Sequence, residues 1–160
     1  MEEIWDEVVD SIKDILGKTP LEEDLDTAIN NKLWLAPNTL FRSLAEKTHS
    51  DVDSNVILKT IRESLRLSPR NWRKIYKALI LADMIIRFGS RRALSEIQNE
   101  MFKIRMLTDF SYCDEGREYG NEVRQSAKEI GRILGDIRLL EAEREKARAY
   151  MGKCHENFDM

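Results

Sequence analysis

Four basic side chains crowd one end of the stretch between residues 68 and 86. They are Arg70, Arg73, Lys74 and Lys77, and the second half of the stretch is almost entirely apolar. On a helical wheel the four cations fall within an arc of about 100°, opposite the apolar side chains of the same turns. Like charges at this spacing repel one another, and the helix dipole disfavours cations at a helix N-terminus. The pattern therefore indicates a site for a multiply charged anion such as phosphate, unless the cations form a solvated face with salt bridges.

The distribution of charge limits where an anion could bind. The chain has 160 residues and a formal net charge of −3 at pH 7, so its surface as a whole does not attract polyanions. Residues 1–50 hold eleven acidic and five basic side chains, whereas residues 51–160 hold eighteen acidic and twenty-one basic ones. Any anion-binding function must therefore be local and lie in the second part of the chain.

Targeting and cysteine patterns favour a cytosolic protein. No apolar run approaches the roughly 18–20 residues that cross a bilayer, and the N-terminus is acidic where a signal peptide would be basic. Cys113 and Cys154 form no motif, so we expect two free thiols in a reducing compartment.

The elements that must position the cations are predicted to be helices. Prolines and glycines are few, alternating runs are scarce, and helix-start signals stand at Thr19 before Pro20, at Ser50, and at Ser68 before Pro69. Short connections between the helices predict that neighbours in sequence stack as antiparallel pairs. The predicted helices are 3–16, 20–31, 38–47, 51–67, 69–88, 91–107, 121–134 and 136–151.

The stretch that carries the cations resembles the central signature of a known family. "RNWRKIYKALILADMIIRFGSRRALSEI" is similar to the signature of ENTH (epsin N-terminal homology) domains, and "LTDFSYCDEGREYGNEVRQSAKEI" and "DIRLLEAEREKARAY" resemble later segments of the same family. Upstream, Ala28, Asn31 and Trp34 fall where the family has its Ala-Thr-x-x-x-Pro-Trp segment. The resemblance spans roughly Leu25 to Tyr150, and the start of the chain looks closest to the Golgi/endosomal epsin-related branch.

This resemblance implies a fold and a domain division. ENTH domains are all-α, and the expected architecture is a right-handed, solenoid-like superhelix of about eight helices, similar to ENTH and VHS domains. We expect an amphipathic acidic N-terminal helix at residues 1–18, the ENTH domain at 19–151 and a frayed C-terminal end at 152–160.

The resemblance also implies a function. ENTH domains bind phosphoinositide headgroups, and this chain is expected to be a peripheral adaptor module of clathrin-coated vesicle trafficking. Its location would be the cytosolic face of Golgi/endosomal membranes or the plasma membrane. The implied partners are phosphoinositide membranes, clathrin and adaptor proteins reached through a tail outside this chain, and, in the Golgi/endosomal branch, a SNARE protein.

The headgroup ligands can be transferred residue by residue. The family's positions on the central helix match Arg70, Lys74 and Lys77, and Asn31 matches a further ligand position, whereas Arg73 is expected to point at neighbouring acids and ranks lower. Two positions that are basic in the family are Asp26 and Ser64 in this chain. These replacements weaken the expected lipid site more than they weaken the expected fold.

The first helix has the apolar stripe of a membrane-inserting helix, but its charge is negative where such helices are normally positive. Its apolar stripe would suit insertion between lipids, but residues 1–16 carry six acidic side chains and one basic one, and interfacial helices normally bring bases to anionic lipid. We therefore expect the stripe to pack on the domain, to swap onto another copy or to contact a protein partner. The stripe consists of Ile4, Trp5, Val8, Ile12 and Ile15, with Val9 and Leu16 beside them.

Other functions compete with lipid binding. One alternative is a protein-interaction domain of the same fold, binding a SNARE, cargo or coat partner, whose lipid affinity is weak or lost. Nucleic-acid binding is remote, because Trp72 and Tyr76 face away from the cations and the net charge is negative. His49 and His155 lack the spacing of a metal site, and no residues suggest catalysis, so we expect no enzyme, cofactor or metal.

Overall fold

The computed structural model describes residues 2–158, with the side chains of residues 3–12 and 17–153. Within this range the chain forms nine α-helices, two 3₁₀ turns and one short hairpin, which confirms the all-helical prediction. The helices are α1 (Glu2–Leu16), α2 (Pro20–Ala28), α3 (Asn38–Lys47), α4 (Asp51–Leu65), α5 (Trp72–Phe88), α6 (Arg91–Asn99), α7 (Met101–Met106), α8 (Asn121–Leu134) and α9 (Ile137–Phe158). None of the described helices combines the length and the apolarity that crossing a bilayer requires.

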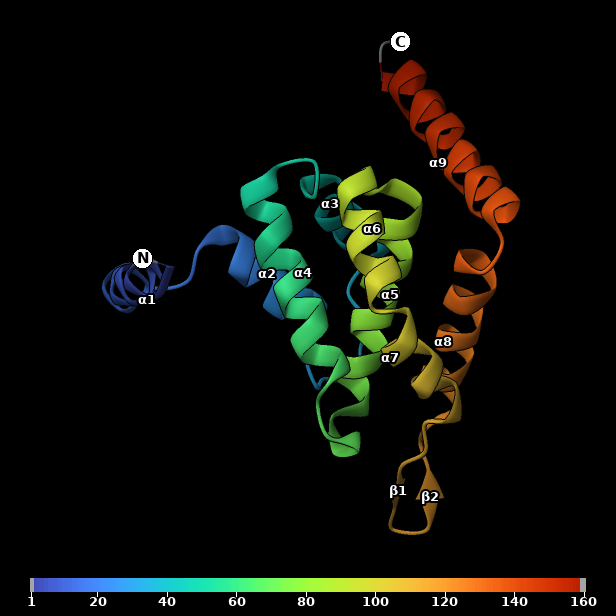
Figure 1. Cartoon of the computed structure of the whole chain (residues 1–160), viewed down its shortest axis with the longest axis horizontal. Helices are drawn as coiled ribbons and strands as arrows, with labels where there is room; N and C mark the ends of the chain where they lie inside the picture. Colours follow the sequence, from blue (N-terminus) through green and yellow to red (C-terminus); the bar gives the residue numbers. More distant parts are fainter. Residues whose placement is uncertain (1, 159–160) are drawn as a thin grey trace.

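Helix α5 is the centre of the fold. It packs against α3 and α4 on one side and against α8 and α9 on the other, as Figure 1 shows. Its apolar second half is enclosed by these neighbours, and each fully buried Leu or Ile side chain stabilises the fold by about 1.5–3 kcal/mol. The fully buried residues of this half are Ala78, Leu79, Leu81, Ala82, Ile85 and Ile86.

Local capping explains where several helices begin. The Thr19 hydroxyl accepts a hydrogen bond from the Glu22 amide at 3.2 Å, and Pro20 occupies the first turn of α2. The Ser90 hydroxyl accepts one from the Ala93 amide at 3.0 Å at the start of α6. These caps satisfy amides that have no partner inside the helix, and the start of α2 coincides with the predicted signal at Thr19.

The segment predicted as one helix at residues 91–107 is two helices. Helix α6 ends at Asn99 and α7 begins at Met101, because the chain turns at Glu100. The Glu100 carboxylate is nearly buried there and forms an ion pair at 2.8 Å with Arg66, the residue that follows α4. The turn also lets both short helices bury an isoleucine, so a long-range contact and packing override the continuous helical pattern.

The predicted loop after α7 contains a small hairpin. A 3₁₀ turn, η2 (Leu107–Asp109), leads to strands β1 (Cys113–Asp114) and β2 (Arg117–Glu118), which pair antiparallel. Glu115 and Gly116 between them both have positive φ, at 50° and 77°, as a tight hairpin turn requires. The hairpin protrudes from the helical body near the start of α8 (Figure 1).

The two terminal helices differ in how they join the body. Figure 1 shows α1 beside α2, joined to it by a connecting segment. Helix α9 extends to Phe158, and fraying of the end from residue 152 stays a prediction. Residues 159–160 lie outside the described range.

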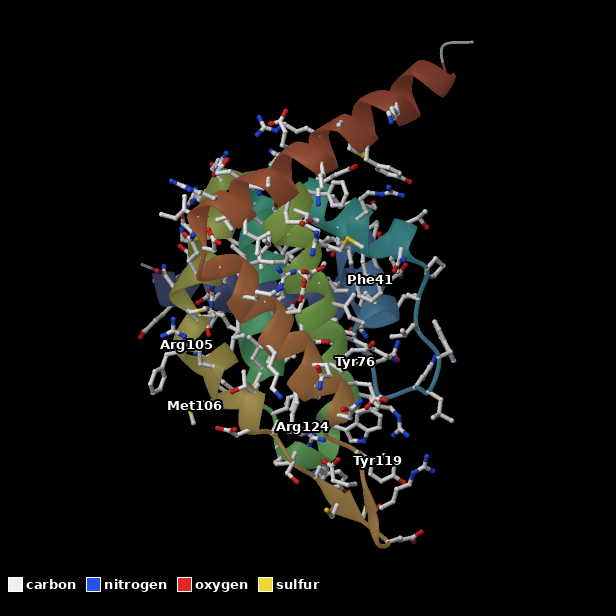
Figure 2. The ribbon with its side chains drawn as sticks, turned by 90° about the vertical axis from the view of Figure 1, so that its right-hand side faces the viewer. Phe41, Tyr76, Arg105, Met106, Tyr119 and Arg124 are labelled. Carbon is white, nitrogen blue, oxygen red and sulfur yellow. The ribbon has the colours of Figure 1, made fainter. Side chains whose placement is uncertain are left out.

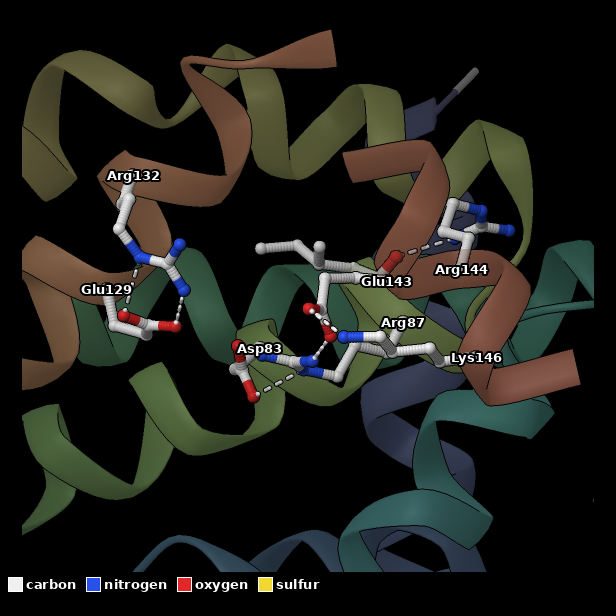
Figure 3. A network of polar contacts seen from close by, with 8 residues as sticks. Asp83, Arg87, Glu129, Arg132, Glu143, Arg144 and Lys146 are labelled. Carbon is white, nitrogen blue, oxygen red and sulfur yellow. Dashed lines mark hydrogen bonds and ion pairs between the residues drawn. The ribbon is translucent and has the colours of Figure 1, made fainter. Parts of the chain in front are cut away.

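A polar network attaches α9 to α5. Arg87 of α5 donates to Asp83 at 3.2 Å and forms an ion pair with Glu143 of α9 (Figure 3). Arg144 donates to the carbonyls of Ile86 at 2.7 Å and Gly89 at 2.8 Å, so it caps the C-terminal end of α5. Burial raises the pKa of Asp83 although Arg87 lies beside it. The network holds α9 at the end of α5 opposite the predicted cationic site.

Candidate anion-binding site

The cations found in the sequence gather where α5 begins. A 3₁₀ turn, η1 (Pro69–Asn71), carries Arg70, which is exposed, and leads into the first turn of α5, where Arg73 and Lys74 are half-buried. None of these three cations forms an ion pair with a described residue. Their charges are therefore not neutralised within the described part of the chain, and the N-terminal end of the helix adds to the positive potential.

Lys77 is placed differently from the other three. It is only 2% exposed, and its ammonium donates three hydrogen bonds inside the protein. The acceptors are the side-chain oxygen of Asn30 at 2.7 Å and the carbonyls of Lys32 at 2.7 Å and Trp34 at 3.0 Å. Burial lowers the pKa of Lys77, and the nearby charges of Arg73 and Lys32 lower it further. An ammonium has three donors, so this one is fully used in holding the segment between α2 and α3.

The Asn30 side chain also holds that segment in place, although the sequence pattern did not predict Asn30 as a site residue. Its side-chain amide donates to the carbonyls of Asp26 at 3.0 Å and Thr27 at 2.9 Å, which closes the end of α2. Its side-chain oxygen also accepts from the Lys32 amide at 3.0 Å. An asparagine directly after a helix is a common capping residue, and this signal could have identified it.

Asn31 joins the α2–α3 segment to the start of α5. Its side-chain amide donates to the side-chain oxygen of Asn71 at 3.1 Å, and Asn71 in turn donates to the Ser68 hydroxyl at 3.1 Å. The predicted site residue Asn31 is thereby brought to the 3₁₀ turn that carries Arg70. Polar and cationic groups from two distant parts of the sequence meet at this point.

A groove of about 330 Å³ lies on the α8 side of this end of α5. The Arg73 guanidinium lies 4.7 Å from the centroid of its neighbour's ring, Trp72. Glu122 of α8 also lines the groove but forms no ion pair with Arg73 among the described residues. Burial, and secondarily Glu122, raises the pKa of Tyr76. The groove is lined by Lys32, Leu33, Leu35, Trp72, Arg73, Tyr76, Lys77 and Glu122.

A second, smaller hollow lies on the other side and contains Lys74. Its volume is about 210 Å³, and Asp26, Glu63 and Ser64 are among its lining residues. Asp26 forms an ion pair with Lys18, and the Ser64 hydroxyl is turned away to the Thr60 carbonyl at 2.7 Å. The four cations that share one face of the helical wheel therefore lie in four different places. The groove contains Arg73, the smaller hollow Lys74, the exposed 3₁₀ turn Arg70 and the interior Lys77.

The hairpin supports the same end of α5. The ring of Tyr119 stacks on Trp72 with centroids 5.5 Å apart. Arg124 of α8 donates to Glu118 at 2.8 Å and to the Phe110 carbonyl at 2.9 Å. Figure 2 shows Tyr76, Tyr119 and Arg124 gathered where the hairpin meets α5 and α8. The Arg124 hydrogen bond, with a second one from the Gly120 amide, lowers the pKa of Glu118 to about 2.

The apolar stripe of α1 is not covered by the rest of the described chain. Ile4, Trp5, Val8 and Ile12 are all exposed, with Trp5 at 67%. Ile15, also predicted as part of the stripe, lies outside the described side chains. Of the expected alternatives, packing of the stripe on the chain's own domain is therefore not the arrangement in this structure.

Comparisons with known proteins place this architecture in a family. The ENTH domain model matches residues 18–140. Epsin-3 of Saccharomyces cerevisiae is 35% identical over 84% of this chain and 33% of its own length. An ENTH domain-containing protein of Schizosaccharomyces pombe is 33% identical over 87% of this chain and 30% of its own length. The chain thus spans about a third of the length of these relatives.

Solved structures show the same fold. The ENTH domain of human epsinR matches with a TM-score of 0.75 and 27% identity, over 83% of this chain and 99% of that one. The epsin-2 ENTH domain in complex with phosphatidylinositol 4,5-bisphosphate matches with a TM-score of 0.78 and 25% identity, over 82% and 93%. ANTH and ENTH tubules on membranes containing this lipid match with a TM-score of 0.73 and 27% identity, over 96% and 99%. With a family model covering most of its length and this fold, the chain belongs to the ENTH domain family.

Proposed function

We propose that this chain is a phosphoinositide-binding module that attaches peripherally to membranes and serves as an adaptor in clathrin-coated vesicle trafficking. The observation that carries the proposal is the group of three cations at the start of α5, none of which forms an ion pair with a described residue. A multiply charged phosphate would satisfy these cations through charge-assisted hydrogen bonds. The proposal requires no catalytic residue, metal or cofactor.

Two solved relatives support the choice of ligand. The epsin-2 ENTH domain was solved in complex with phosphatidylinositol 4,5-bisphosphate, and ANTH and ENTH domains form tubules on membranes that contain this lipid. These are properties of those proteins. They make a phosphoinositide the first ligand to test on a chain with the same fold and a cationic cluster.

The proposed headgroup ligands follow from the geometry. Arg70 and Lys74 supply charge, Arg73 adds charge from the larger groove, and Asn31 supplies a hydrogen bond beside the 3₁₀ turn. Lys77 has all three donors occupied, so its proposed role is to hold the α2–α3 segment that carries Asn31. The resemblance to ENTH domains instead predicts Lys77 as a direct ligand.

Vesicle binding with a charge-reversal variant tests the proposal. Binding of the parent protein to vesicles with different phosphoinositides should weaken with added salt, because the contacts are ionic. The Arg70→Glu/Lys74→Glu variant should bind at least about tenfold more weakly, because it loses two close ionic contacts. Arg138→Glu/Arg148→Glu on α9 makes the same charge change at exposed positions and should stay within about twofold of the parent.

Two results would contradict lipid binding. One is that the parent protein does not bind phosphoinositide vesicles. The other is that the Arg70→Glu/Lys74→Glu and Arg138→Glu/Arg148→Glu variants bind them equally well. Either would favour the second candidate, a protein-interaction domain for a SNARE, cargo or coat partner. That candidate is favoured by Asp26 and Glu63 beside Lys74 and by the exposed apolar stripe on the acidic α1.

The cellular setting belongs to the same proposal. The cytosolic face of Golgi/endosomal membranes or of the plasma membrane would present phosphoinositides to this site. The Golgi/endosomal branch suggested by the sequence stays part of the proposal, since the similar solved structures include the ENTH domains of both human epsinR and epsin-2. Clathrin and adaptor proteins would be recruited by further chain outside these residues, since the relatives are about three times longer.

A further inference from the structure

Three consecutive large apolar side chains project from the segment between α2 and α3. Leu33 is 85% exposed, Trp34 49% and Leu35 48%. This cluster, the apolar tip, follows the polar residues Asn30, Asn31 and Lys32 in the connection between the two helices. Contiguous exposed apolar side chains on a folded domain mark a contact surface more often than they mark solvent-facing loop.

The backbone of the apolar tip is fixed from inside the protein. The Lys77 ammonium donates hydrogen bonds to the carbonyls of Lys32 and Trp34 and to the side-chain oxygen of Asn30. The Asn30 side chain is itself anchored on the last turn of α2. The tip is therefore presented in one conformation, and binding through it costs little ordering entropy.

Two accessible cations, Lys32 and Arg73, lie beside the apolar tip, together with the buried Lys77 and one acid, Glu122. The Lys32 ammonium lies 5.4 Å from the centroid of the Trp34 ring, and that of Lys77 lies 5.9 Å from it. Arg73 lines the same groove as Leu33 and Leu35. An apolar centre with a cationic border matches an anionic bilayer, in which tryptophan sits at the headgroup level and basic side chains meet phosphates.

The tip is also continuous with the proposed headgroup site. Asn31 directly precedes Lys32 and bonds to the 3₁₀ turn that carries Arg70. A lipid whose headgroup meets Arg70 and Arg73 would thus bring its membrane surface to the tip. Figure 2 shows the blue segment between α2 and α3 running along the outside of the molecule on the side of Tyr76.

We propose that the apolar tip, Leu33 to Leu35, inserts into the bilayer interface when the neighbouring cations bind a phosphoinositide. This inference rests on the proposed function and adds the second contact that holds the domain on the membrane. The acidic α1 is poorly suited to that role, whereas the tip combines apolar side chains with charges of the favourable sign. A soluble headgroup contacts the cations alone, so the two contributions can be measured separately.

The test compares a soluble inositol phosphate with vesicles that carry the matching phosphoinositide. The full-length Leu33→Ser/Leu35→Ser variant should bind the soluble inositol trisphosphate within about twofold of the parent by calorimetry, because no cation changes. Its binding to vesicles should fall at least about tenfold, because two leucines no longer enter the lipid. Phe102→Ser/Met106→Ser on α7 removes two other exposed apolar side chains, 79% and 55% exposed, and should leave vesicle binding unchanged. Met106 lies on the opposite side of the view in Figure 2 from the tip segment.

Fluorescence locates the insertion directly. With Trp5→Phe/Trp72→Phe as background, Trp34 is the single tryptophan left in the sequence, and brominated lipids in the phosphoinositide vesicles should quench its emission. The inference is overturned if Trp34 is not quenched, or if the leucine variant binds vesicles as well as the parent. In either case, binding of the soluble headgroup would leave the proposed function standing. A parent protein that binds neither the soluble headgroup nor the vesicles overturns both.

Discussion

At the scale of one residue, Lys77 shows that a basic side chain can lie beside a predicted anion site while its ammonium is bonded inside the protein. On the helical wheel it is equivalent to Arg70 and Lys74, but in the fold it is buried and bonded to the α2–α3 segment. Burial of an ammonium is tolerated here because all three donors find oxygen acceptors. Its contribution to binding is therefore indirect, through the position of Asn31 and the apolar tip.

Stability measurements separate these two kinds of cation. Lys77→Met removes the donor to the Lys32 and Trp34 carbonyls and one of the two hydrogen bonds to the Asn30 side-chain oxygen, so the free energy of unfolding should fall by about 2–3 kcal/mol in urea denaturation. Arg70→Met removes an exposed, unpaired cation and should change the unfolding free energy by less than about 0.5 kcal/mol. Equal stability of the two variants would mean that the Lys77 hydrogen bonds contribute little.

Glu118 gives a second residue-scale prediction, in its pH dependence. Its folded-state pKa of about 2 lies below the ordinary value of 4.5, with the Arg124 hydrogen bond as the main cause. The stabilisation is therefore fully present above pH 4.5 and is lost as the pH falls through the folded-state pKa. Carbon-detected NMR titration should show the low midpoint, and Arg124→Gln should raise it toward the ordinary value. An unchanged midpoint in the variant would exclude Arg124 as the cause.

At the scale of elements, polar contacts at the C-terminal end of α5 join it to α9, which also buries Leu140 and Ala147. Arg144 supplies donors to two carbonyls that the helix itself leaves open, and Arg87 bridges Asp83 and Glu143. Charged donors at a helix C-terminus also interact favourably with the helix dipole. The attachment depends on side chains from positions more than fifty residues apart.

Removing this cap should loosen the α5–α9 contact. Arg144→Leu deletes two charge-assisted hydrogen bonds, so the free energy of unfolding should fall by about 2–4 kcal/mol in chemical denaturation. Arg148→Leu, one turn later, removes only an exposed pair with Glu145 and should cost less than about 0.5 kcal/mol. If the two variants prove equally stable, α9 is held by its apolar contacts instead.

At the scale of the whole molecule, charge and apolar surface are divided between two regions. The acidic α1 exposes its apolar stripe, whereas the cations at the start of α5 lie beside the apolar tip. A membrane with anionic lipid attracts the second region and repels the polar face of the first. The molecule therefore has one face suited to a membrane and a separate helix suited to a protein partner.

This division predicts how α1 variants behave on membranes. The full-length Trp5→Ser/Val8→Ser variant should bind phosphoinositide vesicles within about twofold of the parent in a sedimentation assay, because the proposed contacts lie elsewhere. The Leu33→Ser/Leu35→Ser variant measured alongside it should lose binding. Strong loss by the α1 variant alone would instead identify α1 as the membrane wedge.

The sequence by itself determined the local features of this protein. The helix start at Thr19, the buried second half of α5 and the cationic cluster follow from capping and periodicity within single segments. The family resemblance added the fold. The break at Glu100 was not predicted, since its partner Arg66 lies far away in sequence.

Only the tertiary structure decided what each cation faces. The wheel places Lys77 beside Lys74, but its acceptors come from residues 30–34, more than forty positions earlier in the chain. The same contacts hold the segment that carries Leu33 and Leu35 beside Arg73. No pattern within one segment of the sequence could have predicted that these residues lie close together. A helical wheel describes one helix in isolation, whereas burial and partners depend on which other segments pack against it.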